Sequence, residues 1–193
     1  MTLLSLITFI IFPACSQNTL TEVREKDKIV ATEEHSYFEP VSFPKRPIKN
    51  GNWASPPAVF VCSGTPITEV RIENAMDFWR RQGYELVGPF MNSNLSACRG
   101  EDNFSWGNII VDLRGQSFPF GKLALTTTYR KTSDNTIVGA VIKIQGFTSE
   151  KERTIEHEIG HAFGWKHFNR KYHMMNEAYE LGGWDSFGLK NIK

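Results

Sequence analysis

The most constraining feature of this sequence is a short segment in which three histidines, one glutamate and one glycine stand at fixed spacings. His157 and His161 lie four residues apart, with Glu158 between them. In an α-helix this spacing places the two imidazoles one above the other, about 5–6 Å apart between their Cβ atoms. Two imidazoles in that position can bind one zinc ion at about 2.0–2.1 Å. The segment therefore predicts a helix that carries two ligands for one metal ion.

The residues that follow predict the third ligand. Gly164 comes three residues after His161 and favours the left-handed conformation that ends a helix. The chain can then turn back and bring His167 to the metal, which leaves one position open for water, as a catalytic zinc requires. Glu158 is turned about 100° from His157 around the helix, where it can reach that water as a general base without being a ligand. Another type of zinc site, in which Glu177 or Glu180 supplies the third ligand, is disfavoured by the position of His167.

The segment His157-Glu158-Ile159-Gly160-His161-Ala162-Phe163-Gly164-Trp165-Lys166-His167 resembles the long zinc signature of the metzincin metallopeptidases. In that family a turn bearing a methionine lies beneath the metal; Met174 and Met175 follow at a suitable distance, and Met175 has the spacing of the matrixin-like branch. The resemblance covers residues 58–187, although only its last third is specific. It implies an α+β fold: a twisted mixed β-sheet with a backing helix, a zinc-binding active-site helix and a small C-terminal subdomain.

The resemblance also implies an activity. It is that of a zinc-dependent endopeptidase, with one catalytic Zn²⁺ on His157, His161 and His167, Glu158 as general base, and a protein or peptide as substrate. Two alternatives stay open. One is a non-catalytic zinc- or peptide-binding module on the same fold, which would have no use for Glu158. The other is a zinc hydrolase that acts on a non-peptide or cell-wall amide.

The pattern of apolar residues predicts the remaining elements in the same order as in this family. An apolar run at 58–62 indicates a buried strand, and the periodicity after Pro66 indicates an amphipathic helix that ends at Gly83. Further strands are expected at 85–90 and 109–113, then a hairpin of 123–130 and 136–145. Thr126-Thr127-Thr128 favours a strand with one solvent-facing side, so the first arm is expected at a sheet edge, where an extended peptide could bind. A capping box at 149–152 predicts the start of the metal-binding helix.

The N-terminal residues are expected to lie outside the folded domain. The apolar run 3–12 is too short to span a bilayer, which needs about 20 residues, and is typical of a secretory signal peptide, although no basic residue precedes it. A buried N-terminal strand or a misassigned start codon are the alternatives. We therefore expect a signal peptide at 1–16, an extended or disordered tether at 17–52 and the zinc peptidase domain at 53–193, in a secreted or cell-envelope protein.

Composition and cysteine content limit the partners. Lys and Arg number 22 against 21 Asp and Glu, which gives no basic excess for a nucleic acid or an acidic membrane. We expect a monomer whose only membrane contact is a lipid anchor at Cys15, where a lipoprotein signal would place an acylated cysteine; plain cleavage near Ser16 is the alternative. Cys62 and Cys98 form either a disulfide or two buried thiols.

Overall fold

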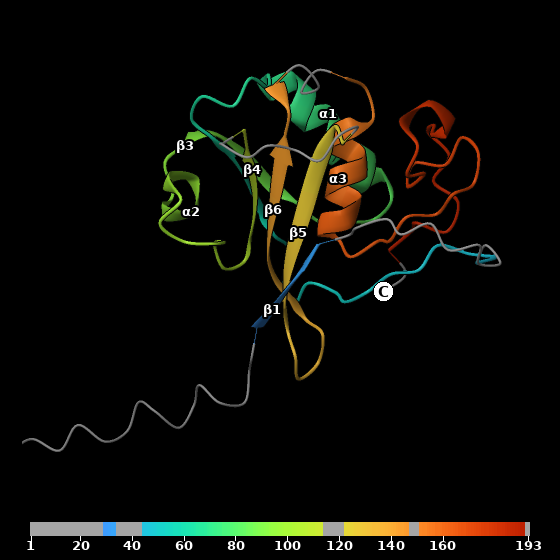
Figure 1. Cartoon of the computed structure of the whole chain (residues 1–193), viewed down its shortest axis with the longest axis horizontal. Coiled ribbons are helices and arrows are strands. Elements are labelled where there is room, and N and C mark those ends of the chain that lie inside the picture. Colours follow the sequence, from blue (N-terminus) through green and yellow to red (C-terminus); the bar gives the residue numbers. More distant parts are fainter. Residues whose placement is uncertain (1–28, 34–43, 114–121, 147–150, 192–193) are drawn as a thin grey trace, which may run out of the picture.

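A mixed sheet of six strands forms the frame of the domain, and α1 and α3 pack side by side on one of its faces (Figure 1). The computed structural model describes residues 29–33, 44–113, 122–146 and 151–191. Its elements are β1 Ile29–Glu33, β2 Ala58–Cys62, α1 Glu69–Arg81, β3 Val87–Ser93, α2 Ser96–Arg99, β4 Asn108–Asp112, β5 Ala124–Lys131, β6 Ile137–Ile144, α3 Thr154–Ala162 and the short 3₁₀ helix η2 Tyr179–Leu181. The fold is therefore α+β, as the sequence predicts.

The strand order is β1-β5-β6-β4-β2-β3. Strands β2, β3, β4 and β6 are parallel, whereas β5 runs antiparallel to β6 and β1 antiparallel to β5. The predicted hairpin is confirmed, with Asn135 in the left-handed region at its turn. The strand expected at 85–90 is found a few residues later, at Val87–Ser93.

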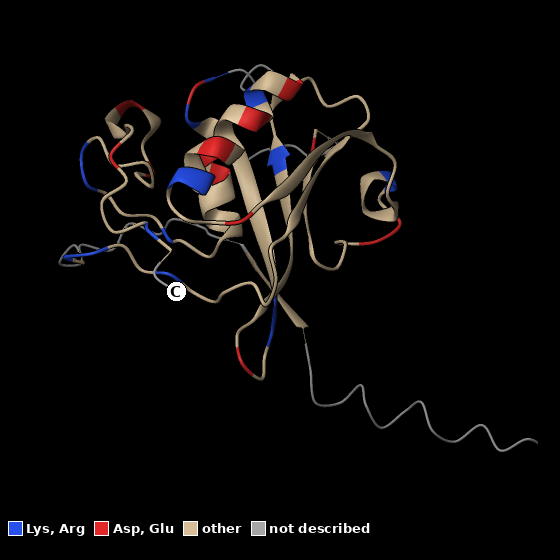
Figure 2. Ribbon diagram, turned by 180° about the vertical axis from the view of Figure 1, so that it is seen from behind, with Lys and Arg blue, Asp and Glu red and all other residues tan. Residues whose placement is uncertain are grey.

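The main core lies between the sheet and the two helices. Alternate residues of the central strands point into it, and Trp79 of α1 is fully buried at its centre. The Trp79 indole donates a hydrogen bond to the carbonyl of Glu156 at 2.7 Å, which ties α1 to α3. Acidic and basic residues are interspersed along α1 (Figure 2), whereas its buried residues are apolar. The amphipathic helix expected after Pro66 is thus confirmed.

A smaller apolar cluster covers the opposite face of the sheet. Here Cys62 of β2 and Cys98 of α2 form a disulfide, with their Cα atoms 5.4 Å apart. Of the two possibilities for these cysteines, the structure therefore has the disulfide. Ile110 and Val141 pack beside it.

Strand β1 bears on two sequence-based expectations, the extended or disordered tether at 17–52 and the sheet edge at 123–130. Residues 29–33 are extended, but they belong to the sheet, because they pair with β5 as strand β1. β1 pairs with residues 127–131, so β5 is not the outermost strand there. Only Ala124–Thr126 has no partner on its outer side among the described strands. Residues 48–50 also pack on the domain, through backbone hydrogen bonds with Gly164 and Lys166.

Other expectations fall beyond the described part of the chain. The predicted signal peptide at 1–16 and the lipid-anchor residue Cys15 lie outside it. Within the residues that the structure describes, no helix has the length and apolar character to span a bilayer.

Candidate metal centre

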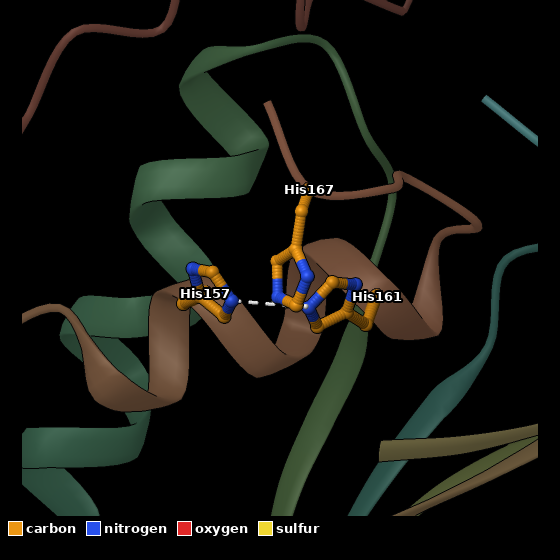
Figure 3. Close-up of side chains that lie close together, drawn as sticks. All are labelled: His157, His161 and His167. Carbon is orange, nitrogen blue, oxygen red and sulfur yellow. Dashed lines mark hydrogen bonds between the residues drawn. The ribbon is translucent and has the colours of Figure 1, made fainter. Parts of the chain in front are cut away.

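Three histidine rings converge at the middle of α3 (Figure 3). His157 and His161 come from the helix, and His167 comes from the segment that follows it. The Nε2 atom of His161 lies 3.0 Å from Nε2 of His157 and 3.1 Å from Nε2 of His167. The three predicted ligands are therefore brought together, and they could hold a metal ion.

The other nitrogen of each helix histidine is fixed by a backbone carbonyl. Nδ1 of His157 lies 2.9 Å from the Met174 carbonyl oxygen, and Nδ1 of His161 lies 2.7 Å from that of Trp165. A carbonyl only accepts, so each Nδ1 carries the proton and each Nε2 presents a lone pair. The geometry selects the tautomer that binds a metal through Nε2.

Burial keeps these rings neutral. It lowers the pKa of His157 to about 3, with the charge of His167 as a second cause, and it lowers the pKa of His161 well below its ordinary value. Burial also lowers the pKa of His167, although the carboxylate of Glu177 acts in the opposite direction. Neutral imidazole is the form that binds metals, so proton competition is weak near pH 7.

Gly164 directs the chain back toward the helix. Its φ is +90°, and a Cβ at this position would collide with the backbone carbonyl of Asn50. The Asn50 amide donates to the Gly164 carbonyl at 2.7 Å, which fixes the turn from outside. The predicted end of the helix is confirmed, since α3 stops at Ala162. Its start differs from the expected one: the helix begins at Thr154, after Arg153 in the left-handed region, and the first two residues of the predicted capping box, 149 and 150, lie outside the described residues.

Two methionines and His173 fill the space beneath the helix. Met174 and Met175 are fully buried. Met174 contributes its carbonyl to His157, whereas the Met175 thioether occupies the space that a side chain at Gly160 would fill. His173 accepts a hydrogen bond from the Met175 amide at 3.0 Å and lies near the Phe187 carbonyl, so it is a packed turn residue outside the histidine cluster.

Glu158 lies beside the cluster and lines the same cleft. Its Oε2 accepts a hydrogen bond of 2.5 Å from the Thr126 hydroxyl. Burial raises the pKa of Glu158 to about 7, while the hydrogen bond from Thr126 and the charge of Lys122 act against that rise. The sequence missed the role of Thr126. Burial alternates along β5, as expected for a strand with one solvent-facing side, and Thr126 and Thr128 lie on its buried face.

Glu177 and Lys122 form the other charged group near the cluster. Oε2 of Glu177 is 4.0 Å from Nδ1 of His167, and its Oε1 is 3.5 Å from the Lys122 ammonium. Glu177 is on the Nδ1 side of the ring, away from the converging Nε2 atoms, so it does not replace His167 as a ligand. Its position next to His167 was not predicted, because only the fold brings the two together.

The histidines open into a cleft of about 640 Å³. One wall runs from Lys122 to Thr126, at the beginning of β5, and the other is the segment from Asn176 to Leu181. His157, Glu158, His161 and His167 line the space between them. The arrangement can bring a metal ion, a carboxylate base and an extended ligand together. Comparison of the chain with protein-family models, with curated proteins and with solved structures finds no match.

Proposed function

We propose that this chain is a zinc-dependent endopeptidase of the metzincin type. The observation that carries the proposal is the convergence of three imidazoles, two from α3 and one from the segment after it, with the Glu158 carboxylate beside them in an open cleft. A purely structural metal site would need no carboxylate base within reach and no cleft.

The donor set fits zinc. Imidazole nitrogens bind zinc and other transition metals, whereas magnesium and calcium prefer oxygen ligands. His157, His161 and His167 would hold the ion, and their Nδ1 partners orient the two helix rings. When bound, zinc acidifies a water molecule and polarises the scissile carbonyl.

Residues of the chain supply the proton transfers and the substrate contacts. Glu158 accepts a proton from the attacking water and then passes it to the leaving amine. Thr126 orients the Glu158 carboxylate through its hydroxyl. The outer edge of Ala124–Thr126 borders the cleft and offers backbone groups to an extended peptide.

The location of the protein outside the cytoplasm is part of the same proposal. The Cys62–Cys98 disulfide supports it, because disulfides persist mainly in oxidising compartments. The signal peptide at 1–16 and the lipid anchor at Cys15 stay predictions, which mass spectrometry of the mature N-terminus would test.

The decisive experiment replaces Glu158 by glutamine. We expect the purified wild type to cleave members of a diverse peptide library and to lose activity in a chelator. Glu158→Gln should lower cleavage by about 10²–10⁴-fold, because the amide cannot accept the water proton. Zinc content should not change, since all three imidazoles stay in place.

A matched control is Glu180→Gln, which changes an exposed carboxylate that lines the same cleft. It should leave cleavage within a few-fold of wild type. Equal cleavage by wild type and Glu158→Gln would refute the role of Glu158. A wild type that binds zinc and peptides without cutting any of them would favour the binding-only module.

A further inference from the structure

The end of the cleft next to the N-terminus of α3 has an unusual collection of hydrogen-bond donors. Lys151, Arg153 and Thr154 line the cleft there, close to His157 in the first turn of the helix. None of these three residues takes part in the proposed bond cleavage.

The two cations at this end have no carboxylate partner among the described residues. Both pack on the ring of Tyr179, with the Arg153 Cζ 4.5 Å and the Lys151 Nζ 5.3 Å from its centroid. Nη2 of Arg153 donates a 2.6 Å hydrogen bond to the Tyr179 carbonyl. The guanidinium is therefore held in place at the cleft wall by neutral groups alone.

Thr154 adds a buried hydroxyl that lacks a partner. Its residue is 4% exposed, and its Oγ1 makes no hydrogen bond within the part of the chain that the structure describes. A buried polar group without a hydrogen-bond partner lowers the free energy of unfolding unless a ligand or a water molecule bonds to it. The residue lines the cleft, so a ligand bound at this wall is a candidate partner for the hydroxyl.

The helix itself contributes positive potential at the same place. α3 has nine residues, and Arg153, which precedes it, gives no side-chain hydrogen bond to cap it. The first amide groups of an uncapped helix carry partial positive charge and favour an anion.

Three carboxylates of the helix and the cleft wall make no ion pair with these cations in the described part of the chain. Glu156 points toward α1, where Arg71 binds both of its oxygens at 2.8 and 2.6 Å. Glu177 is paired with Lys122. Glu180 is exposed and makes no ion pair with Arg153 or Lys151.

We propose that this end of the cleft binds the carboxylate of an acidic side chain, Asp or Glu, of the peptide substrate. The proposal rests on the proposed function above and adds a substrate class to it. Arg153 and Lys151 provide the charge, and the Thr154 hydroxyl and the first turn of α3 provide short-range hydrogen-bond donors.

The test compares peptide pairs that differ only by Glu or Gln at one position. For a sequence that the wild type cleaves, each position on both sides of the cut bond is varied in turn. We expect one position at which Glu is favoured over Gln by about tenfold in kcat/KM. The zinc-loaded Glu158→Gln protein cuts slowly, so its affinity for peptides can be measured. It should bind the Glu peptide about tenfold more tightly than the Gln peptide.

Three variants test which residues cause the preference for Glu over Gln. Arg153→Gln should bring the Glu/Gln ratio close to one, and Lys151→Gln should lower it. Thr154→Val, which keeps the shape but removes the hydroxyl, should lower the ratio a few-fold without loss of stability. The control is Lys171→Gln, an exposed lysine on the ring of Tyr172 outside the cleft, which should keep the ratio of wild type.

The possible results separate the two proposals. Cleavage without a Glu preference at any position would overturn the acidic subsite and leave the peptidase intact. A preference that survives in both Arg153→Gln and Lys151→Gln would overturn it as well. If Arg153→Gln does not fold, the result for Lys151→Gln decides whether the acidic subsite exists. Lys151 is exposed, so its replacement should not affect folding. No cleavage and no binding of any peptide by the zinc-loaded wild type would refute the proposed function, and this inference with it.

Discussion

The three candidate ligands are held in two different ways. His157 and His161 lie on a helix whose apolar side is fully buried, and backbone carbonyls fix their rings at 2.9 and 2.7 Å. His167 lies in an irregular segment after Gly164, and the Glu177 side chain lies 4.0 Å from its Nδ1. The helix pair is thus preorganised by the core, whereas the third ligand depends on a turn and on a side chain.

This difference separates what is rigid in the centre from what can be adjusted. The helix ligands cannot move without disturbing Trp79 and the packing of Met175 against Gly160. His167 is set by contacts that reach across the chain: Asn50 at the turn and the Glu177 carboxylate at the cleft wall. Changes to the two kinds of support should therefore have different consequences.

The largest expected effect comes from removing a ligand. His161 lies within 3.1 Å of both other Nε2 atoms, so it is the centre of the cluster. His161→Ala should lower zinc affinity by more than about 100-fold. Loss of a group that only hydrogen-bonds to a ligand typically lowers affinity by about 10–100-fold, and loss of the ligand itself should have a larger effect. His167→Ala should lower it less, because the two preorganised helix ligands stay in place.

Chelator competition on the purified variants measures this order. As a control, His173→Gln alters a buried histidine outside the cluster. It should keep stoichiometric zinc. If His167→Ala bound zinc more weakly than His161→Ala, the helix pair would not be the preorganised part of the centre.

The sequence predicted this centre well because its spacing is local. A four-residue interval on a helix fixes His157 and His161 relative to each other, and a glycine three residues later allows the turn that returns His167 to them. The strands of the central sheet were predictable for a similar reason, since apolar runs such as 58–62 and 109–113 indicate buried strands.

The remaining features depend on contacts between distant parts of the chain. Thr126 meets Glu158 only because β5 lies beside α3. β1 has only five residues, and it is placed by backbone pairing with β5, which composition does not reveal. The positions of Glu177 and Lys122 beside His167 likewise require the folded cleft.

An intermediate effect is expected from Gly164→Ala. Alanine is strained at a φ of +90°, and its Cβ would collide with the Asn50 carbonyl. The variant should lose more than about 1 kcal/mol of unfolding free energy. It should also bind zinc more weakly than wild type, because the turn that positions His167 must shift.

Gly100→Ala provides a matched control. Gly100 also has a positive φ, of +76°, but a Cβ there would meet nothing within 4 Å. Gly100→Ala should lower the free energy of unfolding by about 1 kcal/mol through backbone strain alone, and it should leave zinc affinity unchanged. Urea unfolding of both variants measures the effect of backbone strain on stability, and chelator competition measures the effect of any displacement of His167 on zinc affinity. Unchanged zinc affinity in Gly164→Ala would show that the turn does not control the third ligand.

The smallest effect is expected from Glu177→Gln. A metal-bound His167 donates its Nδ1 proton, and a carboxylate is a stronger acceptor than an amide oxygen. The 4.0 Å separation leaves room for adjustment of the ring or the carboxylate when the metal binds. Glutamine keeps the shape but removes the charge, so zinc affinity should fall by about tenfold, at the low end of the range for outer partners.

Loss of the Lys122–Glu177 ion pair should not obscure this result, because a pair of partly exposed groups contributes about 0–1 kcal/mol. Lys122→Gln breaks the same ion pair but keeps the carboxylate next to His167. If Glu177 acts through His167, Glu177→Gln should weaken zinc binding and Lys122→Gln should not, with both variants equally stable without metal. Equal weakening in the two variants would mean that the ion pair across the cleft, and not the contact with the imidazole, supports the third ligand.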